Sequence, residues 1–74
     1  MKPRFKIGTL FKTRGKHPRV CIVTDIHTTR DSRGEIVKIR YVATHEFAGQ
    51  TVTNSDVVDT TIAMGLIETK EHES

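Results

Sequence analysis

The chain of 74 residues contains a single cysteine, so no disulfide can form within it. A zinc site built from two or four cysteines of one chain is excluded for the same reason. No apolar run approaches the roughly 20 residues of a membrane-spanning helix. We therefore expect a soluble, cytoplasmic domain of a reducing compartment that makes no contact with membranes.

Aromatic residues are also scarce, with three phenylalanines, one tyrosine and no tryptophan. Proteins that read single-stranded nucleic acid stack several bases on aromatic rings, and here the core needs at least two of the four rings. Sequence-specific reading of a single strand is therefore not expected. The five glycines are dispersed, so the chain contains no glycine-rich phosphate loop.

Residues that bind metals or act as nucleophiles are few and badly spaced. The candidates are one thiol and four imidazoles, with no H-x-x-x-H or C-x-x-C spacing: Cys21, His17, His27, His45 and His72. Cys21 lies in an apolar stretch, where a thiol behaves as a small hydrophobe. A core in so short a chain also leaves little volume for a pocket. We expect a non-enzymatic protein without metal, cofactor or small-molecule substrate.

Charge is present in quantity and is unevenly distributed. Residues 1–19 contain seven basic and no acidic residues, whereas residues 41–74 contain one basic and six acidic residues, within a net charge of +3. Such asymmetry predicts two oppositely charged surfaces. One interpretation is a basic face that binds a polyanion; the other is that the two halves pair with each other inside the fold.

Alternating and β-branched residues predict strands over residues 5–11, 20–28, 36–42 and 50–53. The stretch VCIV at 20–23 is apolar on both faces, which predicts a central strand covered on each side. The polar residues 30–35 predict a hairpin between the two longest strands. Asn54, Ser55 and Asp56 are candidate N-caps for a short helix near 57–64, and Gly65 fits a left-handed residue that ends it, with Leu66 packing back onto its last turn.

Four or five short antiparallel strands and one short C-terminal helix predict a mainly β protein, a small barrel closed on itself. We expect residues 1–67 to form a single domain and residues 68–74 to form a flexible acidic tail. The predicted core collects the inward apolar residues of every element: Phe5, Ile7, Leu10, Val20, Ile22, Ile26, Val37, Ile39, Tyr41, Val52, Val58, Ile62 and Leu66.

Two sets of three segments each carry a resemblance to known proteins. FKIGTLF at 5–11, VCIVTDI at 20–26 and IVKIRYV at 36–42 resemble the layout of an SH3-like small barrel, which KOW and Tudor modules share. YVATHEFAGQTVT at 41–53, DVV at 56–58 and TIAMGL at 61–66 resemble small uncharacterised proteins of phages and other mobile elements. The first resemblance implies an interaction module, although the sequence lacks the clustered aromatics of a Tudor cage for methyl-lysine.

The candidate binding residues are basic side chains of the first loop and of the hairpin, together with one aromatic anchor. They are Lys12, Arg14, Lys16, Arg19, Arg30, Arg33, Lys38, Arg40 and Phe47. Phe47 lies in a candidate contact loop over 44–50, where it either anchors a partner or caps the barrel. In a barrel, we expect the first loop and the hairpin tip to lie on the same side. The partner is then an acidic protein surface, with a homodimer as a further possibility, or alternatively nucleic acid bound without sequence specificity.

Overall fold

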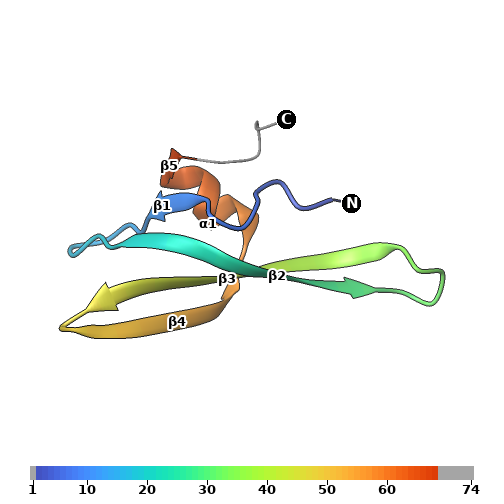
Figure 1. The fold of residues 1–74 in the computed structure, drawn as a ribbon. Coiled ribbons are helices and arrows are strands. Elements are labelled where there is room, and N and C mark those ends of the chain that lie inside the picture. Colours follow the sequence, from blue (N-terminus) through green and yellow to red (C-terminus); the bar gives the residue numbers. More distant parts are fainter. Residues whose placement is uncertain (1, 69–74) are drawn as a thin grey trace.

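Runs of β-branched residues make this a mainly β protein in the computed structural model, which describes residues 2–68 (Figure 1). Five strands form one antiparallel sheet in the order β4-β3-β2-β1-β5. The elements are β1 (Leu10–Lys12), β2 (Val20–Arg30), β3 (Ile36–Phe47), β4 (Gln50–Val57), α1 (Asp59–Met64) and β5 (Leu66–Glu68). The predicted mainly β fold of antiparallel strands with a short C-terminal helix is confirmed.

The sheet is not closed into a barrel, contrary to the prediction. Its two edge strands, β4 and β5, pair with β3 and β1 respectively and not with each other. Closure would require the edge strands β4 and β5 to pair, and β5 offers only three residues for that pairing. The open sheet is elongated, with principal extents of 44 × 25 × 19 Å.

The long hairpin of β2 and β3 is confirmed, and its loop explains why the chain reverses there. The Asp31 carboxylate accepts hydrogen bonds from the backbone N–H groups of Arg33 (2.8 Å) and Glu35 (3.0 Å). Gly34 has a φ of 84°, a conformation that glycine adopts without strain. Beyond the reach of β1 and β4, residues 27–40 continue as a ribbon of two strands (Figure 1).

The connection between β3 and β4 is much shorter than predicted. Residues 44–47 belong to β3, so the expected contact loop over 44–50 is reduced to a turn of two residues, Ala48 and Gly49. Both have positive φ, 54° and 78°, as the two central residues of a type I′ hairpin turn require. The strand predicted at 50–53 extends to Val57, so the candidate N-caps at 54–56 lie in β4.

The core lies on one face of the sheet, under α1 and the N-terminal segment. Its buried apolar residues are Phe5, Phe11, Cys21, Val23, Tyr41, Ala43, Val57 and Ile62, with Ile26 and Ile39 packed against them. The rings of Phe5 and Tyr41 meet edge to face at 6.2 Å between centroids. The Tyr41 hydroxyl accepts a hydrogen bond from the backbone N–H of Arg4 at 3.0 Å, which holds the N-terminal segment on the sheet.

The predicted core is correct for Phe5, Tyr41 and Ile62 and wrong for several other residues. Six of its members are exposed: Ile7, Val20, Ile22, Val37, Val52 and Leu66. In β2, Cys21 and Val23 face the core, so the start of the strand is one residue out of phase with the prediction. A bulge between Val23 and Asp25 then turns Ile26 back toward the core.

The stretch at 20–23 is central in the sheet but is covered on one face only. Val20 and Ile22 are 53% and 40% exposed because α1 packs against the opposite face, where Ile62 is fully buried. Four apolar residues in a row therefore do not show that both faces of a strand are covered.

The helix begins later than predicted and ends differently. Val58 occupies the N-cap position without a side-chain hydrogen bond, and Gly65 has a φ of −120°, which is not left-handed. Glycine is required there for space, because a Cβ atom would collide with the carbonyl oxygen of Lys12. The Lys12 N–H donates to the Gly65 carbonyl at 2.7 Å, and Leu66 enters β5 beside β1 instead of packing back onto the helix.

Glu68, the first residue of the predicted acidic tail, belongs to β5, and the rest of that tail, 69–74, lies outside the described residues. Between residues 2 and 68, no helix has the length and apolar character needed to cross a membrane.

Candidate interaction surface

The first loop, between β1 and β2, presents its basic side chains from a pinned base. The Thr13 N–H donates to the Arg19 carbonyl at 2.9 Å, and the Arg19 N–H donates to the Thr13 hydroxyl at 2.8 Å. These two bonds close the loop, so that residues 14–18 are exposed at its tip. Gly15 has a φ of 119° at this tip, and a Cβ atom added there would meet nothing within 4 Å. The loop is therefore open to a partner.

Phe47 lies beside this loop at the end of β3. The guanidinium of Arg19 covers its ring at 4.3 Å from the centroid, and the side chain is still 50% exposed. Phe47 thus does not cap a core, which was the alternative to its role as an anchor. We call this surface the basic end and define it by five residues: Lys12, Arg14, Lys16, Arg19 and Phe47.

Among residues 2–67, whose side chains the structure describes, the cations of the basic end have no ion-pair partner. Arg14 contacts the sulfur of Met64 at 3.6 Å instead. The nearby carboxylate of Glu46 accepts a hydrogen bond from the Thr51 hydroxyl at 2.7 Å. Four positive charges therefore remain uncompensated by the described residues at one end of the molecule.

The remaining candidates lie on the hairpin and are only partly available. Arg40 pairs with Asp56 at 3.2 Å, and Arg30 donates to the Gly34 carbonyl at 2.8 Å. Arg33 and Lys38 are exposed and make no ion pair with the described residues. We call Arg30, Arg33, Lys38 and Arg40 the hairpin cluster.

The basic end and the hairpin tip lie at opposite ends of the molecule, and the expectation that they share one side is wrong (Figure 1). The first loop precedes β2 and the hairpin tip follows it. Because a strand rises about 3.3 Å per residue, the 11 residues of β2 separate them by roughly 33 Å. The predicted single basic face is thus two separate basic surfaces.

Pairing between the basic and acidic halves of the sequence is limited among the described residues. Arg4 lies 3.6 Å from Asp59, and Arg40 pairs with Asp56. A contact of 3.4 Å between Nε2 of His27 and the Asp25 carboxylate lies within one strand and joins no residues of the two halves. Neutralisation between the halves therefore leaves the basic end untouched.

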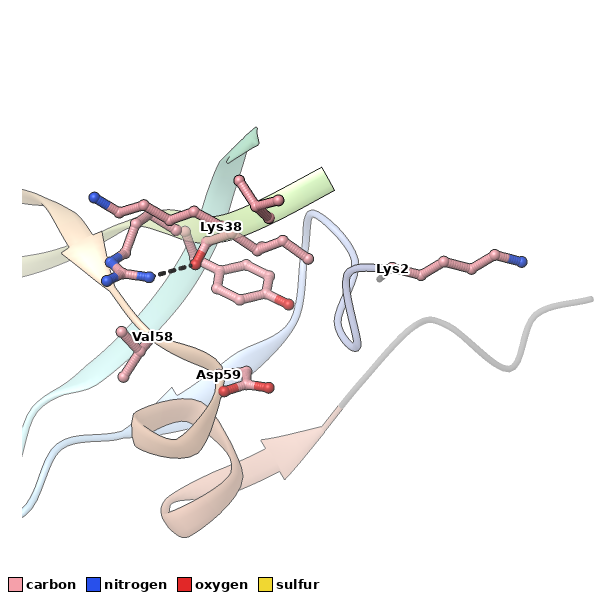
Figure 2. Close-up of a pocket in the computed structure, with 8 residues that line it drawn as sticks. Lys2, Lys38, Val58 and Asp59 are labelled. Atoms are coloured by element: carbon pink, nitrogen blue, oxygen red, sulfur yellow. Dashed lines mark hydrogen bonds between the residues drawn. The ribbon is translucent and has the colours of Figure 1, made fainter. Parts of the chain in front are cut away.

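A groove of about 430 Å³ lies between the hairpin, the N-terminal segment and the start of α1 (Figure 2). Val37, Ile39 and Tyr41 line it from β3, and Val58 lines it from the segment before α1. Four ionic residues line it, and they do not converge on a point: Lys2, Lys38 and Asp59 lie apart (Figure 2), and the Arg40 guanidinium is held by Asp56 and the Ile39 carbonyl. The sequence did not reveal this groove, because it depends on the N-terminal segment crossing beside the hairpin.

A smaller cavity of about 80 Å³ is lined by Cys21 and His45, the one thiol and imidazole in contact among the described residues. The Cys21 sulfur lies 3.9 Å from Nδ1 of His45. Burial raises the pKa of the Cys21 thiol, which disfavours the nucleophilic thiolate. Within residues 2–68, no group of three or more histidine, cysteine, aspartate or glutamate side chains is placed to hold a metal ion.

No protein-family model matches the chain, and no curated protein or solved structure is significantly similar to it.

Proposed function

We propose that this protein is a non-enzymatic interaction module that binds an acidic protein surface through its basic end. The observation that carries the proposal is a set of four cations at one end of the molecule without acidic partners among the described side chains. One of them, Arg19, lies over the half-exposed ring of Phe47. Charged hydrogen bonds from arginine to carboxylates are among the strongest that proteins make across an interface.

The residue types at the basic end favour a protein partner. Arginine and aromatic side chains are enriched at the centres of protein interfaces. Phe47 supplies an exposed apolar ring, and the guanidinium carbon of Arg19 lies over it at 4.3 Å from the centroid. A partner that covers Phe47 and brings carboxylates to Arg14 and Lys16 would use both features at once.

We further propose that this protein is an SH3-like module. The chain returns after α1 so that β5 pairs with β1, an order compatible with the SH3-like layout that the sequence resembles. The phage or mobile-element origin that the second half resembles, and a cytoplasmic location, belong to the same proposal. Binding without catalysis is supported by Cys21, whose burial raises the thiol pKa.

The test compares two variants with the same change in net charge. Arg14→Glu with Lys16→Glu reverses two exposed cations of the basic end, and Arg33→Glu with Lys38→Glu reverses two exposed cations of the hairpin cluster. Each tagged chain is used to capture proteins from a nuclease-treated host lysate. We expect the wild type and the hairpin variant to retain one stoichiometric partner and the basic-end variant to lose it.

Loss of the partner from both variants to the same degree would contradict the proposal, because net charge alone would then decide binding. Loss of every partner on nuclease treatment would contradict it as well. A folded state of each variant is checked by circular dichroism, so that unfolding is not mistaken for lost binding.

Nucleic acid is the second candidate, and the ribbon at 27–40 favours it. A ribbon of two antiparallel strands fits the major groove of B-form DNA, and here it carries the hairpin cluster. The first loop would supply further phosphate contacts. We expect Arg33→Ala and Arg14→Ala each to weaken binding to duplexes of every sequence by the same factor. We also expect the affinity of the wild type for duplex DNA to fall steeply between low and moderate salt. The absence of a shift with duplex DNA at low salt would remove this candidate.

A further inference from the structure

The edge strand β4 presents an open row of backbone groups. Residues 50–56 are all exposed. Apart from their pairing with β3, residues 50–55 form no backbone-to-backbone hydrogen bond with any other residue between 2 and 68. Every second residue of an edge strand points its N–H and C=O away from the sheet, where another strand can pair with them. The other edge, β5, has only three residues. Of the two edge strands of the sheet, β4 is therefore the longer, with eight residues.

Natural edge strands are usually protected against such pairing by lysine, proline, bulges or shortness. Residues 50–55, QTVTNS, contain no charge, no proline and no glycine. Their pairing with β3 is regular from Gln50 to Asn54, and the bulge comes only after that point. The middle of this edge thus lacks the usual protection.

We propose that a second copy of this chain pairs antiparallel along β4, joining two sheets of five strands into one continuous sheet. A twofold symmetric pair uses the same segment from both copies. The regular segment is 50–54, so the axis passes through its middle residue, Val52. Val52 then faces its own copy, Thr51 faces Thr53, and Gln50 faces Asn54 of the second chain.

The chemistry of these pairs suits self-association. Val52 is 38% exposed, and its copy would cover it. Pairs of threonines across neighbouring strands are among the stabilising combinations in antiparallel sheets. Asp56 is the one charged residue of 50–57, and it falls opposite Ala48 of the second chain rather than opposite an acid.

The geometry also keeps the basic ends apart. Each basic end lies beside the turn that precedes β4, and antiparallel pairing sends the two turns to opposite sides of the axis. Ala48 of one chain is eight residue steps from its copy along the strand direction, or roughly 26 Å at about 3.3 Å per residue. Both basic ends therefore remain open in the dimer, and dimerisation does not depend on the proposed binding of an acidic protein.

The test is the mass of the full chain by sedimentation over a concentration series up to the millimolar range. We expect twice the mass of the 8.4 kDa chain at the upper concentrations. Val52→Lys places two like charges directly opposite each other. We expect the dissociation constant of the dimer to rise roughly tenfold or more. The matched control is Val37→Lys, a valine of similar exposure (51%) on the hairpin, which should leave the dissociation constant unchanged.

A positive test uses Val52→Cys, which should form a reducible dimer under mild oxidation because the two sulfurs meet at the axis. Val37→Cys is its control and should cross-link at the slower rate of random collision. A wild-type chain that keeps the mass of one copy at every concentration would overturn the proposal. A dimer that Val52→Lys leaves unchanged would overturn it too, since the interface would then lie elsewhere.

Discussion

At the residue scale, the turn between β3 and β4 holds an alanine in a conformation that suits asparagine or glycine better. Ala48 has a φ of 54°, the one positive φ of a non-glycine residue among residues 2–68. The left-handed region is unfavourable for a residue with a Cβ atom, by roughly 1–2 kcal/mol. Asparagine tolerates it, and Asn-Gly is the preferred pair of a type I′ turn.

We therefore expect Ala48→Asn to raise the free energy of unfolding by about 0.5–1 kcal/mol, since part of the left-handed penalty is relieved. Urea denaturation measures the change. The control is Ala63→Asn, an exposed position in α1, where asparagine should destabilise the helix slightly. A lower free energy of unfolding for Ala48→Asn would show that the turn gains nothing from the replacement.

Cys21 links stability to alkaline pH. Burial raises the pKa of its thiol above the ordinary value of 9.0. The folded state therefore holds the thiol proton more tightly than the unfolded state does. This contribution to stability is complete below about pH 9 and is lost as pH rises through the higher pKa of the folded state.

We expect the free energy of unfolding to fall with rising pH above about 9, and Cys21→Ala to reduce that slope. Denaturant titrations at a series of alkaline pH values give the free energy of unfolding of the wild type and of Cys21→Ala. An identical slope in the two chains would mean that the thiol does not contribute to it.

At the element scale, the junction between α1 and β5 is set by close packing against β1. Gly65 leaves no room for a Cβ atom because the carbonyl of Lys12 lies against it. The hydrogen bond from Lys12 to the Gly65 carbonyl holds β1 to this junction. The short strands β1 and β5 depend on this contact for their alignment.

Gly65→Ala should therefore destabilise the protein by about 1–3 kcal/mol, the range for a side chain forced into a filled site. Thermal and urea denaturation provide the measurement. Thr60→Ala, a change at an exposed position of α1, should keep the free energy of unfolding within about 0.5 kcal/mol of the wild type. Unchanged unfolding of Gly65→Ala would mean that β1 and the junction separate without penalty.

At the scale of the whole molecule, packing and charge are both unevenly distributed. The core lies between α1 and the half of the sheet that contains β1, whereas none of residues 28–38 belongs to the core or packs against it. A hairpin of two strands alone is marginally stable in water. The basic end lies at the packed end of the molecule, on a firmer support than the hairpin cluster.

Amide hydrogen exchange should follow this gradient. We expect amides of 28–39 to exchange faster than those of 21–23 and 41–45, because the ribbon opens without disturbing the core. Exchange followed by nuclear magnetic resonance resolves the individual residues. Uniform protection along the whole of β2 would show instead that the hairpin unfolds together with the core.

The residues of the interaction surface could be predicted from the sequence, but their positions relative to one another could not. The basic residues of 12–19 are recognisable because no acid interrupts them. Nothing in the order of residues states that Phe47 lies under Arg19, since the two are 28 positions apart and are joined only by the pairing of β2 with β3. The separation of the basic end from the hairpin cluster follows likewise from the length of a single strand.

By itself, the sequence determined the mainly β fold, the long hairpin and the late helix. These follow from local preferences: β-branched residues favour strands, and Asp31 and Gly34 favour the turn where they stand. Only tertiary contacts set which side of β2 is buried, where the helix ends and that the sheet stays open. Those outcomes depend on one bulge, on the fit of Gly65 against Lys12 and on two very short strands. Each is a contact between distant parts of the chain, which no local pattern encodes.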